Sequence, residues 1–294
     1  MTYIIKPAKS LEEITQAEIL RAKSFGKKFG LEKEIDKDEF DDLCDHLLLY
    51  EFLYGIMKLI GTARIRQFKY HKHPLYASQE FDVKEFKKRM PNTIESGRIC
   101  TIQEMDSKKT YYAALMLLSG EKEYAIARNI KNFFGCTSFP TKSKKEEDIL
   151  REAEEIYSYL EQRGATIPRG YLLKSKKDYE GRFNPPLGTN KKLRIPAIAD
   201  IYLMCGAKII SYPFWDKEFH CIDFLTIGDI NAIPPKIQKR LDYVNSFLVF
   251  DEKIKKKTRI PLWKNKKENK IITKIKQKPK KRQIKYQKRF KEAG

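Results

Sequence analysis

The positive charge of this chain is concentrated at its C-terminal end, which limits where a folded core can form. Residues 253–294 contain 19 lysines and arginines and two acidic residues, a net charge of +17 out of +21 for all 294 residues. The remaining 41 basic and 37 acidic residues give residues 1–252 a net charge of only +4. A dense run of like charge is typical of an interaction tail, whereas residues 1–252 are numerous enough to bury a sizeable core. We therefore predict one domain over residues 1–252 and a lysine-rich basic tail over residues 253–294.

Patterns typical of helices and strands alternate along the predicted domain. Ser10 and Glu13 have the spacing of a capping box, and helical periodicity follows as far as Gly30. The segments 46–52 and 57–68 are typical of a β-hairpin with Gly55 in its turn. Further strands are expected at 99–103, 133–139 and 219–227, further helices at 79–90, 110–129, 144–163, 195–207 and 235–247, and a long loop at 164–193. This alternation favours a single α/β domain, with one helix interrupted near Gly120.

Several classes of protein are disfavoured by what the sequence lacks. The five cysteines are widely spaced and form no C-x-x-C motif, so we expect neither a disulfide framework nor a structural zinc site. The most apolar run, residues 111–119, is far too short to cross a bilayer, and we expect no signal peptide. The motifs G-x-x-x-x-G-K-[ST] and G-x-G-x-x-G are absent, which argues against those two kinds of nucleotide site.

An acidic run and an isolated arginine are candidates for a functional site. Six acidic residues lie among the eleven positions from Asp36 to His46, which is typical of either a solvated loop or a cation site. The spacing does not match an EF-hand loop, so we predict no metal site. Arg64 lies in a predicted strand among apolar neighbours, and a buried arginine usually has a carboxylate partner. Asp38, Asp41 and Glu95 are the candidate partners.

A second charged pair, Glu95 and Arg98, lies in the sequence E-S-G-R directly before a predicted strand. The two side chains either form an exposed ion pair, worth about 0–1 kcal/mol, or project together into a cleft. The pattern alone leaves both alternatives open.

Taken in order, these motifs resemble a known family. D-x-D-x-F-D-x-x-C-D-H-L-L at 36–48 is followed by G-T-A-R-I at 61–65, E-S-G-R at 95–98 and F-G-C-T-S-F-P at 134–140. This order resembles the L-ornithine Nα-acyltransferases, members of the GNAT superfamily and relatives of the acyl-homoserine-lactone synthases. The resemblance covers roughly residues 15–245 and none of the basic tail. It implies a GNAT-like α/β fold, in which a central twisted mixed sheet is flanked by helices.

The resemblance also implies roles for particular residues. For catalysis it implies Glu95 as the first choice of general base, Asp41 as the second, and Arg98 beside them. For the amino-acid substrate it implies five side chains: Asp38, Asp45, Arg64, Arg21 and Phe25. For the acyl chain and the pantetheine arm of its donor it implies part of the predicted strand at 133–139: Phe134, Gly135, Cys136, Ser138 and Phe139.

The reaction implied by the resemblance is transfer of a 3-hydroxyacyl group from acyl carrier protein to the α-amine of L-ornithine. The 4'-phosphopantetheine thioester of the carrier is the donor, and no separate cofactor or metal is expected. The coenzyme A signature R/Q-x-x-G-x-G/A is absent, which favours a carrier protein over coenzyme A. Asp38 or Asp45 could pair with the side-chain ammonium of ornithine, and acylation of glycine or another amino acid stays open. A covalent route through Cys44 or Cys136 is less favoured than core packing, because no histidine is placed to activate either thiol.

The basic tail has more than one candidate partner. Lysines interleaved with Ile and aromatic residues suit an anionic membrane surface, at about 1 kcal/mol per basic residue near the surface. The same composition suits nucleic acid, through phosphate contacts and stacking, or the acidic surface of acyl carrier protein. Because the implied product is a lyso-lipid, the membrane is preferred. We expect a cytoplasmic protein that lies peripherally on the inner face of the cell membrane.

Overall fold

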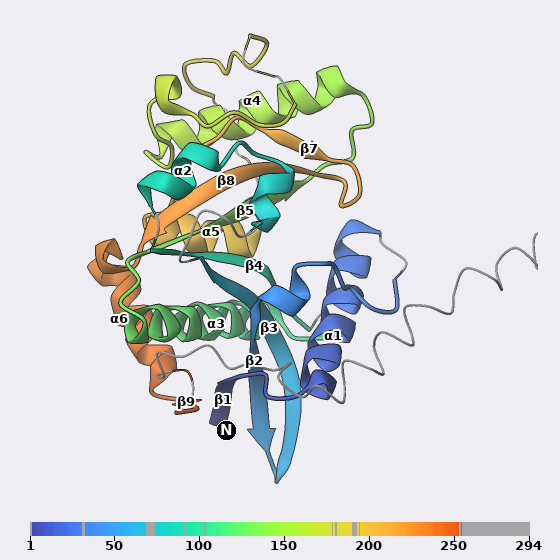
Figure 1. Ribbon diagram of the computed structural model, residues 1–294, viewed down its shortest axis with the longest axis vertical. Helices are drawn as coiled ribbons and strands as arrows, with labels where there is room; N and C mark the ends of the chain where they lie inside the picture. The colour runs from blue at the N-terminus through green and yellow to red at the C-terminus, as the bar shows by residue number, and fades with distance from the viewer. Residues whose placement is uncertain are drawn as a thin grey trace, which may run out of the picture.

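The computed structural model describes residues 2–30, 33–68, 74–90, 92–102, 104–177, 179, 181–189, 193, 195–252 and 254 (Figure 1). The strands are β1 (Thr2–Pro7), β2 (Asp45–Leu53), β3 (Ile56–Phe68), β4 (Thr93–Thr101), β5 (Asn132–Pro140), β6 (Lys208–Ile209), β7 (Phe214–Asp216), β8 (Cys221–Asp229) and β9 (Leu248–Phe250). The helices are α1 (Leu11–Phe29), α2 (Lys84–Arg89), α3 (Ser107–Ala127), α4 (Glu146–Gln162), α5 (Ala197–Met204) and α6 (Pro235–Asn245). Short 3-10 turns are η1 (Asp41–Leu43), η2 (Tyr76–Gln79), η3 (Arg169–Tyr171) and η4 (Ile230–Ala232).

One mixed sheet runs through these residues in the order β6–β8–β5–β4–β3–β2–β1–β9, with β7 paired to β8. The strands β1 to β4 pair antiparallel in sequence order, as do β5 and β8, whereas β4 with β5 and β1 with β9 pair parallel. In Figure 1 the β1–β4 half lies below, with α1 and α3, and the β5–β8 half lies above, beside α2 and α4. This architecture confirms the predicted α/β fold with a mixed sheet flanked by helices.

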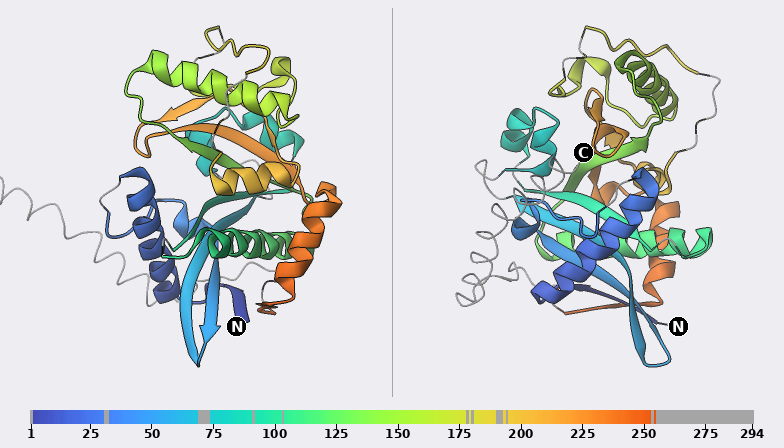
Figure 2. Two further views of the ribbon diagram at one scale, coloured as in Figure 1. Left: turned by 180° about the vertical axis from the view of Figure 1, so that it is seen from behind. Right: turned by 90° about the vertical axis from the view of Figure 1, so that its right-hand side faces the viewer.

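The sheet is covered on both faces, which explains the continuous apolar run in β2. Leu47 and Leu49 are buried in the cluster that contains the apolar residues of α3. Leu48, on the opposite face, packs with Ile14 and Ala17 of α1. A strand buried on both faces carries consecutive apolar residues rather than an alternating pattern. Figure 2 shows α1 and α3 on opposite sides of this part of the sheet.

The predicted interruption of the helix near Gly120 is wrong. Helix α3 continues from Ser107 to Ala127, and Gly120 lies within it. A Cβ atom at Gly120 would lie 2.1 Å from Cδ1 of Ile5 in β1. The glycine therefore serves close packing of α3 against the sheet and does not end the helix.

The sheet opens where β4 and β5 meet. Their parallel pairing runs from Thr93↔Asn132 to Glu95↔Phe134 and ends there, although both strands continue. A Cβ atom at Gly135 would lie 2.1 Å from the carbonyl oxygen of Ser96, so only glycine fits at the point of divergence. Beyond this point β5 pairs with β8 along its whole length, and β4 pairs with β3. The divergence leaves room for a ligand between the two halves of the sheet.

Several boundaries differ from the predictions. The strand expected at 99–103 begins earlier, at Thr93, so that E-S-G-R lies inside β4 rather than before it. The polar residues of E-S-G-R did not indicate a strand, although this segment pairs with β3. The helix expected at 79–90 is divided into η2 and α2. The sequence patterns did not indicate β1, β6, β7 and β9, because β6, β7 and β9 have two or three residues each and β1 is a six-residue segment ending in proline.

The division of the chain at residue 252 stays a prediction. Apart from Ile254, the tail at 253–294 lies outside the described residues. Among the helices that the structure describes, none combines the length and apolar character needed to span a membrane.

Candidate active site

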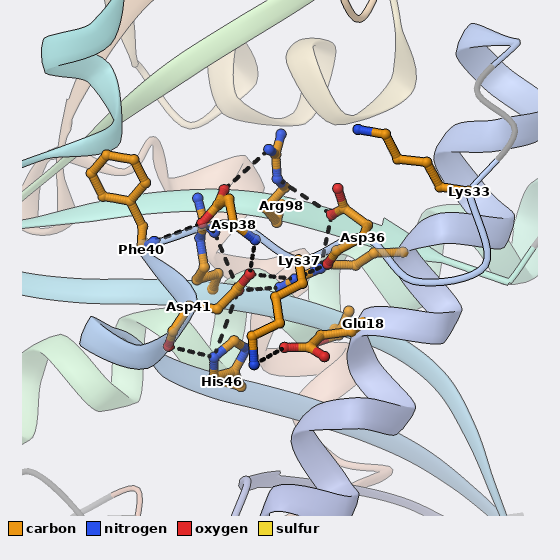
Figure 3. A network of polar contacts seen from close by, with 12 residues as sticks. Glu18, Lys33, Asp36, Lys37, Asp38, Phe40, Asp41, His46 and Arg98 are labelled. Carbon is orange, nitrogen blue, oxygen red and sulfur yellow. Dashed lines mark hydrogen bonds and ion pairs between the residues drawn. The ribbon is translucent and has the colours of Figure 1, made fainter. Parts of the chain in front are cut away.

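The acidic run around Asp41 is neutralised by arginines that come from three different elements (Figure 3). Arg21 of α1 holds both oxygens of Asp41, with Nη1–Oδ1 and Nη2–Oδ2 distances of 2.9 and 3.0 Å. Its Nε lies 3.0 Å from Oδ2 of Asp36. Because α1 lies against β3 and β4, this arginine lies close enough to reach the acidic segment. We call the whole set the paired cluster: Arg21, Arg64, Arg98, Asp36, Asp38 and Asp41.

The two strand arginines complete the paired cluster. Nη1 of Arg64 lies 2.7 Å from Oδ1 of Asp38 and 3.2 Å from Oδ1 of Asp41. Nη2 of Arg98 lies 3.2 Å from Oδ2 of Asp38, and its Nε lies 3.4 Å from Oδ2 of Asp36. Three carboxylates and three guanidinium groups thus balance in charge, and Asp38 and Asp41 are confirmed among the predicted partners of Arg64.

The electrostatics of the paired cluster leave Asp41 a weak base. Although burial opposes ionisation, Arg21 and Arg64 hold the pKa of the Asp41 carboxyl well below its usual range. Its Oδ2 also accepts a 2.8 Å hydrogen bond from the backbone N–H of Asp38. Burial and the neighbouring Arg21 lower the pKa of His46 to about 4, so this histidine is neutral near pH 7. An anion held in this way is suited to positioning the arginines.

A cavity of about 130 Å³ lies where β4 and β5 diverge. The predicted site residues that line it are Phe25, Arg64, Glu95, Arg98, Phe134, Gly135, Cys136 and Ser138. Further lining comes from aromatic and apolar side chains that were not predicted as site residues: Tyr76, Phe133, Ile198, Tyr202 and Phe219. The cavity therefore brings together the E-S-G-R and F-G-C-T-S-F-P motifs, which lie on adjacent strands.

Glu95 is a buried carboxyl at the wall of this cavity. Its Oε2 accepts a 3.0 Å hydrogen bond from the backbone N–H of Tyr76, and its Oε1 accepts a 2.7 Å bond from that of Ala77. Burial raises the pKa of Glu95, and the two N–H donors partly offset this rise. A carboxyl whose pKa is raised toward neutrality, and which borders a cavity, is suited to proton transfer.

Arg98 lies at a β-bulge. On β4, Arg98 and Ile99 stand opposite the single residue Ala63 of β3, because the register shifts from Thr62↔Cys100 to Arg64↔Gly97. The backbone of Arg98 has φ = 52°, a strained value for a residue with a side chain. Its guanidinium lies 4.8 Å from the ring of Tyr76 and 4.6 Å from that of Phe219. The bulge therefore directs Arg98 between two aromatic walls of the cavity.

Some predicted site residues lie away from the cavity. Asp45 accepts a 2.5 Å hydrogen bond from the hydroxyl of Tyr124 in α3. Phe139 is buried with Phe224 in the cluster beneath α4, at a ring distance of 6.0 Å. Successive residues of a strand point to opposite faces, so Phe139 lies on the opposite face of β5 from Cys136 and Ser138. Arg21, Asp38 and Asp41 are not cavity residues either, since they lie in the paired cluster behind Arg64 and Arg98.

A second group of carboxyls was missed by the sequence analysis. Asp216 of β7 and Asp223 of β8 line the cavity. Cys221 lies with them, and the ligand atoms of these three residues are within 4.8 Å of one another, a spacing that could hold a metal ion. The carboxyl of Glu80 contacts both Asp223 and the thiol of Cys136. We call Glu80, Asp216 and Asp223 the unpaired cluster. They belong to Y-A-S-Q-E-F-D and D-K-E-F-H-C-I-D-F at 76–82 and 216–224, the only sequence signal for them.

The unpaired cluster has no arginine or lysine in contact. In the part of the chain that the structure describes, none of its three carboxyls forms an ion pair, and Oε2 of Glu80 has no hydrogen-bond partner. Burial raises the pKa of Asp223 to about 6, and burial together with Asp223 raises that of Glu80 well above its usual value. Carboxyls this close cannot all be ionised unless a cation joins them.

Two further buried groups border the cavity. The hydroxyl of Ser96 donates a 2.6 Å hydrogen bond to Oε1 of Glu121, and burial raises the pKa of Glu121 to about 8. Burial also raises the pKa of Cys44, to about 12, and that of Cys136 well above its usual value. Neither thiol is thus activated as a nucleophile, although both line the cavity.

Comparison with known proteins gives consistent results. Residues 20–116 match the family described as Acetyltransferase (GNAT) domain. The L-ornithine N(alpha)-acyltransferase of Brucella abortus (strain 2308) is 32% identical over 149 residues, which cover 46% of this chain and 52% of that protein. The protein of the same name from Rhizobium meliloti (strain 1021) is 25% identical over 243 residues, which cover 77% of this chain and 79% of that protein. The chain thus spans about half of the first relative and about four fifths of the second.

Solved structures with a similar arrangement include two synthases. The acyl-homoserine lactone synthase BjaI has a TM-score of 0.44 at 11% identity, covering 85% of this chain and 93% of that one. FeeM, an N-acyl amino acid synthase from uncultured soil microbes, has a TM-score of 0.44 at 9% identity, covering 78% and 92%. The domain match, with the diverging mixed sheet, confirms the predicted GNAT-like fold, and the relatives confirm the resemblance that the motifs predicted.

Proposed function

We propose that this chain, a GNAT-type acyltransferase, transfers a 3-hydroxyacyl group from acyl carrier protein to the α-amine of L-ornithine. The product would be lyso-ornithine lipid, and the reaction the first step of ornithine-lipid synthesis. The observation that carries the proposal is the buried carboxyl of Glu95 at a cavity between the diverging strands β4 and β5. Similarity to relatives named L-ornithine N(alpha)-acyltransferase, over about four fifths of the chain, supports the choice of substrate.

The chemistry needs one group to take a proton and another to return one. The neutral α-amine attacks the thioester carbon, so that a C–N bond forms and the C–S bond breaks. Glu95 takes the proton that the amine loses, directly or through a water, and its raised pKa suits this role. The departing thiolate gains a proton, for which the carboxyl of Glu121, whose pKa burial raises to about 8, is a candidate source through the hydroxyl of Ser96 at the cavity wall. Backbone N–H groups along the unpaired edges of β4 and β5 would stabilise the oxyanion.

The donor would enter between the two strands. Phe134, Gly135, Cys136 and Ser138 line the cavity along β5 and would contact the pantetheine arm. The apolar side chains of Phe133 and Ile198 line the same cavity and would contact the acyl chain. Acyl carrier protein is preferred to coenzyme A because no pyrophosphate-binding signature occurs in the sequence.

The unpaired cluster suits the side-chain ammonium of ornithine better than Asp38 or Asp45 does. Asp38 is already paired with Arg64 and Arg98, and Asp45 is bonded to Tyr124. Asp216 and Asp223 face the same cavity as Glu95 and have no ion-pair partner among the described residues. A substrate ammonium would supply the charge that these carboxyls lack. Glycine has no such group and would leave the cluster unpaired.

The basic tail at 253–294 would hold the enzyme on the inner, cytoplasmic face of the cell membrane. Its net charge of +17 favours anionic lipids through long-range attraction. Removing residues 253–294 should abolish binding of the protein to anionic vesicles at low salt. Unchanged vesicle binding, with loss of binding to nucleic acid, would favour the alternative partner.

The function is tested by expressing the full chain in a bacterial host that makes no ornithine lipids. Mass spectrometry of the lipid extract should detect 3-hydroxyacyl-ornithine, and cells expressing the Glu95→Gln variant should lack it. Detection of acylglycine instead would correct the substrate and keep the reaction. Absence of any acylated amino acid, with the protein soluble and folded, would contradict the proposal.

A further inference from the structure

The hairpin between β2 and β3 ends in an apolar tip that no other described element covers. Five large apolar residues in six positions are exposed: Phe52, Leu53, Tyr54, Ile56 and Met57. Tyr54 is 93% exposed and Ile56 is 70% exposed. Figure 2 shows the hairpin extending beyond the rest of the molecule as a narrow projection. Apolar side chains occupy both faces of the projection, whereas a strand with a solvated face carries polar residues there.

The turn of this hairpin is not optimised for folding. Tyr54 and Gly55 both have positive φ, 51° and 80°, as in a type I′ turn. The first position of such a turn favours Asn, Asp or Gly, and an aromatic residue there is strained. A tyrosine at this position therefore indicates a role at the tip itself. Aromatic residues that have an apolar body and a polar end are enriched at membrane–water interfaces.

The dimensions of the tip fit shallow insertion into a bilayer. Phe52 pairs with Met57 and Leu53 with Ile56, while the next pair along the hairpin, Glu51↔Lys58, is charged. At about 3.3 Å per residue, two apolar pairs and the turn reach about 10 Å beyond that charged pair. Peripheral membrane segments bury their apolar side chains about 5–10 Å deep. The charged pair would thus lie at the level of the lipid headgroups.

The hairpin tip is less suited to contact with a second protein molecule than to contact with a bilayer. A stable interface buries about 800 Å² per partner, which a projection of six residues does not provide. The basic tail, with its charge of +17, supplies complementarity to anionic headgroups within the same chain. Shallow apolar insertion and electrostatic attraction together give the two signals that stable peripheral binding requires.

We propose that the β2–β3 hairpin tip, residues 52–57, inserts into the surface of an anionic lipid bilayer. The hairpin supplies an apolar, salt-resistant contact, and the tail supplies a salt-sensitive one. This inference goes beyond the proposed acyl transfer and does not depend on it, because vesicle binding needs no substrate.

The test measures binding of the full chain to phosphatidylcholine vesicles that contain phosphatidylglycerol, at low and at high salt. The variant Tyr54→Ser/Ile56→Ser should bind about tenfold to a hundredfold more weakly at high salt, because two inserted side chains are lost. The matched control is Leu187→Ser, since Leu187 is 97% exposed and lies in the loop beside α4, at the opposite end of Figure 1. This control should bind as the wild type does.

A direct readout of insertion keeps the test independent of affinity. An environment-sensitive fluorophore attached at Ile56→Cys should shift to shorter wavelength on vesicles, and the same label at Leu187→Cys should not. Equal binding of the double variant and the wild type at high salt, or no spectral shift at position 56, would overturn the proposal. A wild-type dimer in sedimentation that becomes monomeric in the double variant would overturn it in favour of contact between copies of the chain.

Discussion

The two buried groups of carboxyls differ in how their charge is balanced. In the paired cluster, Asp36, Asp38 and Asp41 meet three arginines within 3.4 Å or less. In the unpaired cluster, Asp223 and Glu80 contact each other, and no lysine or arginine of the described chain forms an ion pair with them. One cavity connects the two clusters, because Arg64 and Arg98 of the paired cluster and Asp216 and Asp223 of the unpaired cluster line it.

This difference suits the paired cluster to a structural role and the unpaired cluster to binding a cation. A carboxylate that is already matched by guanidinium groups has little to gain from a ligand, whereas a carboxyl kept partly protonated by its neighbours gains from any cation that enters. Density of acidic residues in the sequence pointed to the segment around Asp38 as the site for a substrate ammonium. The three-dimensional charge balance points to Asp216 and Asp223 instead.

The largest expected effect concerns the stability of the paired cluster. The substitution Arg21→Met leaves Asp41 and Asp36 without their closest cation, so the free energy of unfolding should fall by about 3–5 kcal/mol. Urea denaturation followed by circular dichroism measures this change. The control is Lys33→Met, which breaks the exposed ion pair with Glu218 and should change stability by about 0–1 kcal/mol. If the free energy of unfolding fell by the same small amount in both variants, the paired cluster would not be important for stability.

The next effect concerns catalysis at the residue between the two clusters. We expect Glu95→Gln to lower kcat by about 10²-fold or more, because an amide cannot take the proton of the amine. Steady-state assays with acyl carrier protein thioester and L-ornithine measure the loss. The amide oxygen can accept one of the two N–H groups of Tyr76 and Ala77, whereas its NH2 group cannot accept the other, so circular dichroism must first show that the variant is folded. Wild-type-like turnover in folded Glu95→Gln would reject this residue as the general base.

The sequence predicted part of the paired cluster, Arg64 with Asp38 and Asp41, and none of the unpaired one, for a physical reason. Asp36, Asp38 and Asp41 are neighbours along the chain, and an arginine in an apolar strand such as Arg64 requires partners of this kind. In contrast, Glu80 and Asp223 lie far apart in sequence and meet only because β5 pairs with β8 and η2 packs over them. No local pattern encodes that encounter.

The same reasoning applies to the fold. Long periodic segments such as α1 and α4 were predicted because an apolar stripe defines a helix locally, and α1 also has the cap at Ser10. The divergence of β4 from β5 depends on a contact between segments that are far apart in sequence, because Gly135 fits against the carbonyl oxygen of Ser96 at the point of opening. The E-S-G-R sequence was not predicted as a strand, because its polar residues do not alternate with apolar ones. In the structure it belongs to β4 and pairs with β3, with a bulge at Arg98.

A smaller effect tests the role of the unpaired cluster in recognising the substrate. We expect Asp223→Asn to raise KM for L-ornithine by about tenfold to a hundredfold, and to leave KM for L-norvaline, which lacks the terminal ammonium, nearly unchanged. Asp216→Asn should act in the same direction. The matched control is Glu218→Gln, an exposed carboxyl two residues from Asp216.

The selectivity ratio distinguishes the possible results of that experiment. If KM rose equally for L-ornithine and L-norvaline in folded variants, the carboxyls would not bind the side-chain ammonium. Retention of the ornithine preference would contradict the assignment. Stoichiometric uptake of zinc that disappears in Asp216→Asn and Asp223→Asn would identify a metal site with Cys221 instead.

The smallest expected effect is a pH dependence that differs in sign between the clusters. The pKa of Asp223 is raised from 3.8 to about 6 in the folded protein, so the folded state binds the extra proton between these values. The stability that this group contributes is present below about pH 4 and is lost as pH rises through about 6. For Asp41, whose pKa is lowered, stability is present above about pH 4 and is lost as pH falls.

Comparing the wild type with Asp223→Asn isolates the first of these two slopes. Between pH 4 and pH 7 the unfolding free energy of the wild type should fall by about 1–2 kcal/mol relative to that of Asp223→Asn, since the asparagine carries no charge to be buried. Urea titrations at intervals of pH measure it without substrate. A saturating concentration of L-ornithine should reduce the shift, because a bound ammonium stabilises the ionised carboxyl. A flat difference over this range would mean that Asp223 is already matched by a cation, and the contrast between the two clusters would then fail.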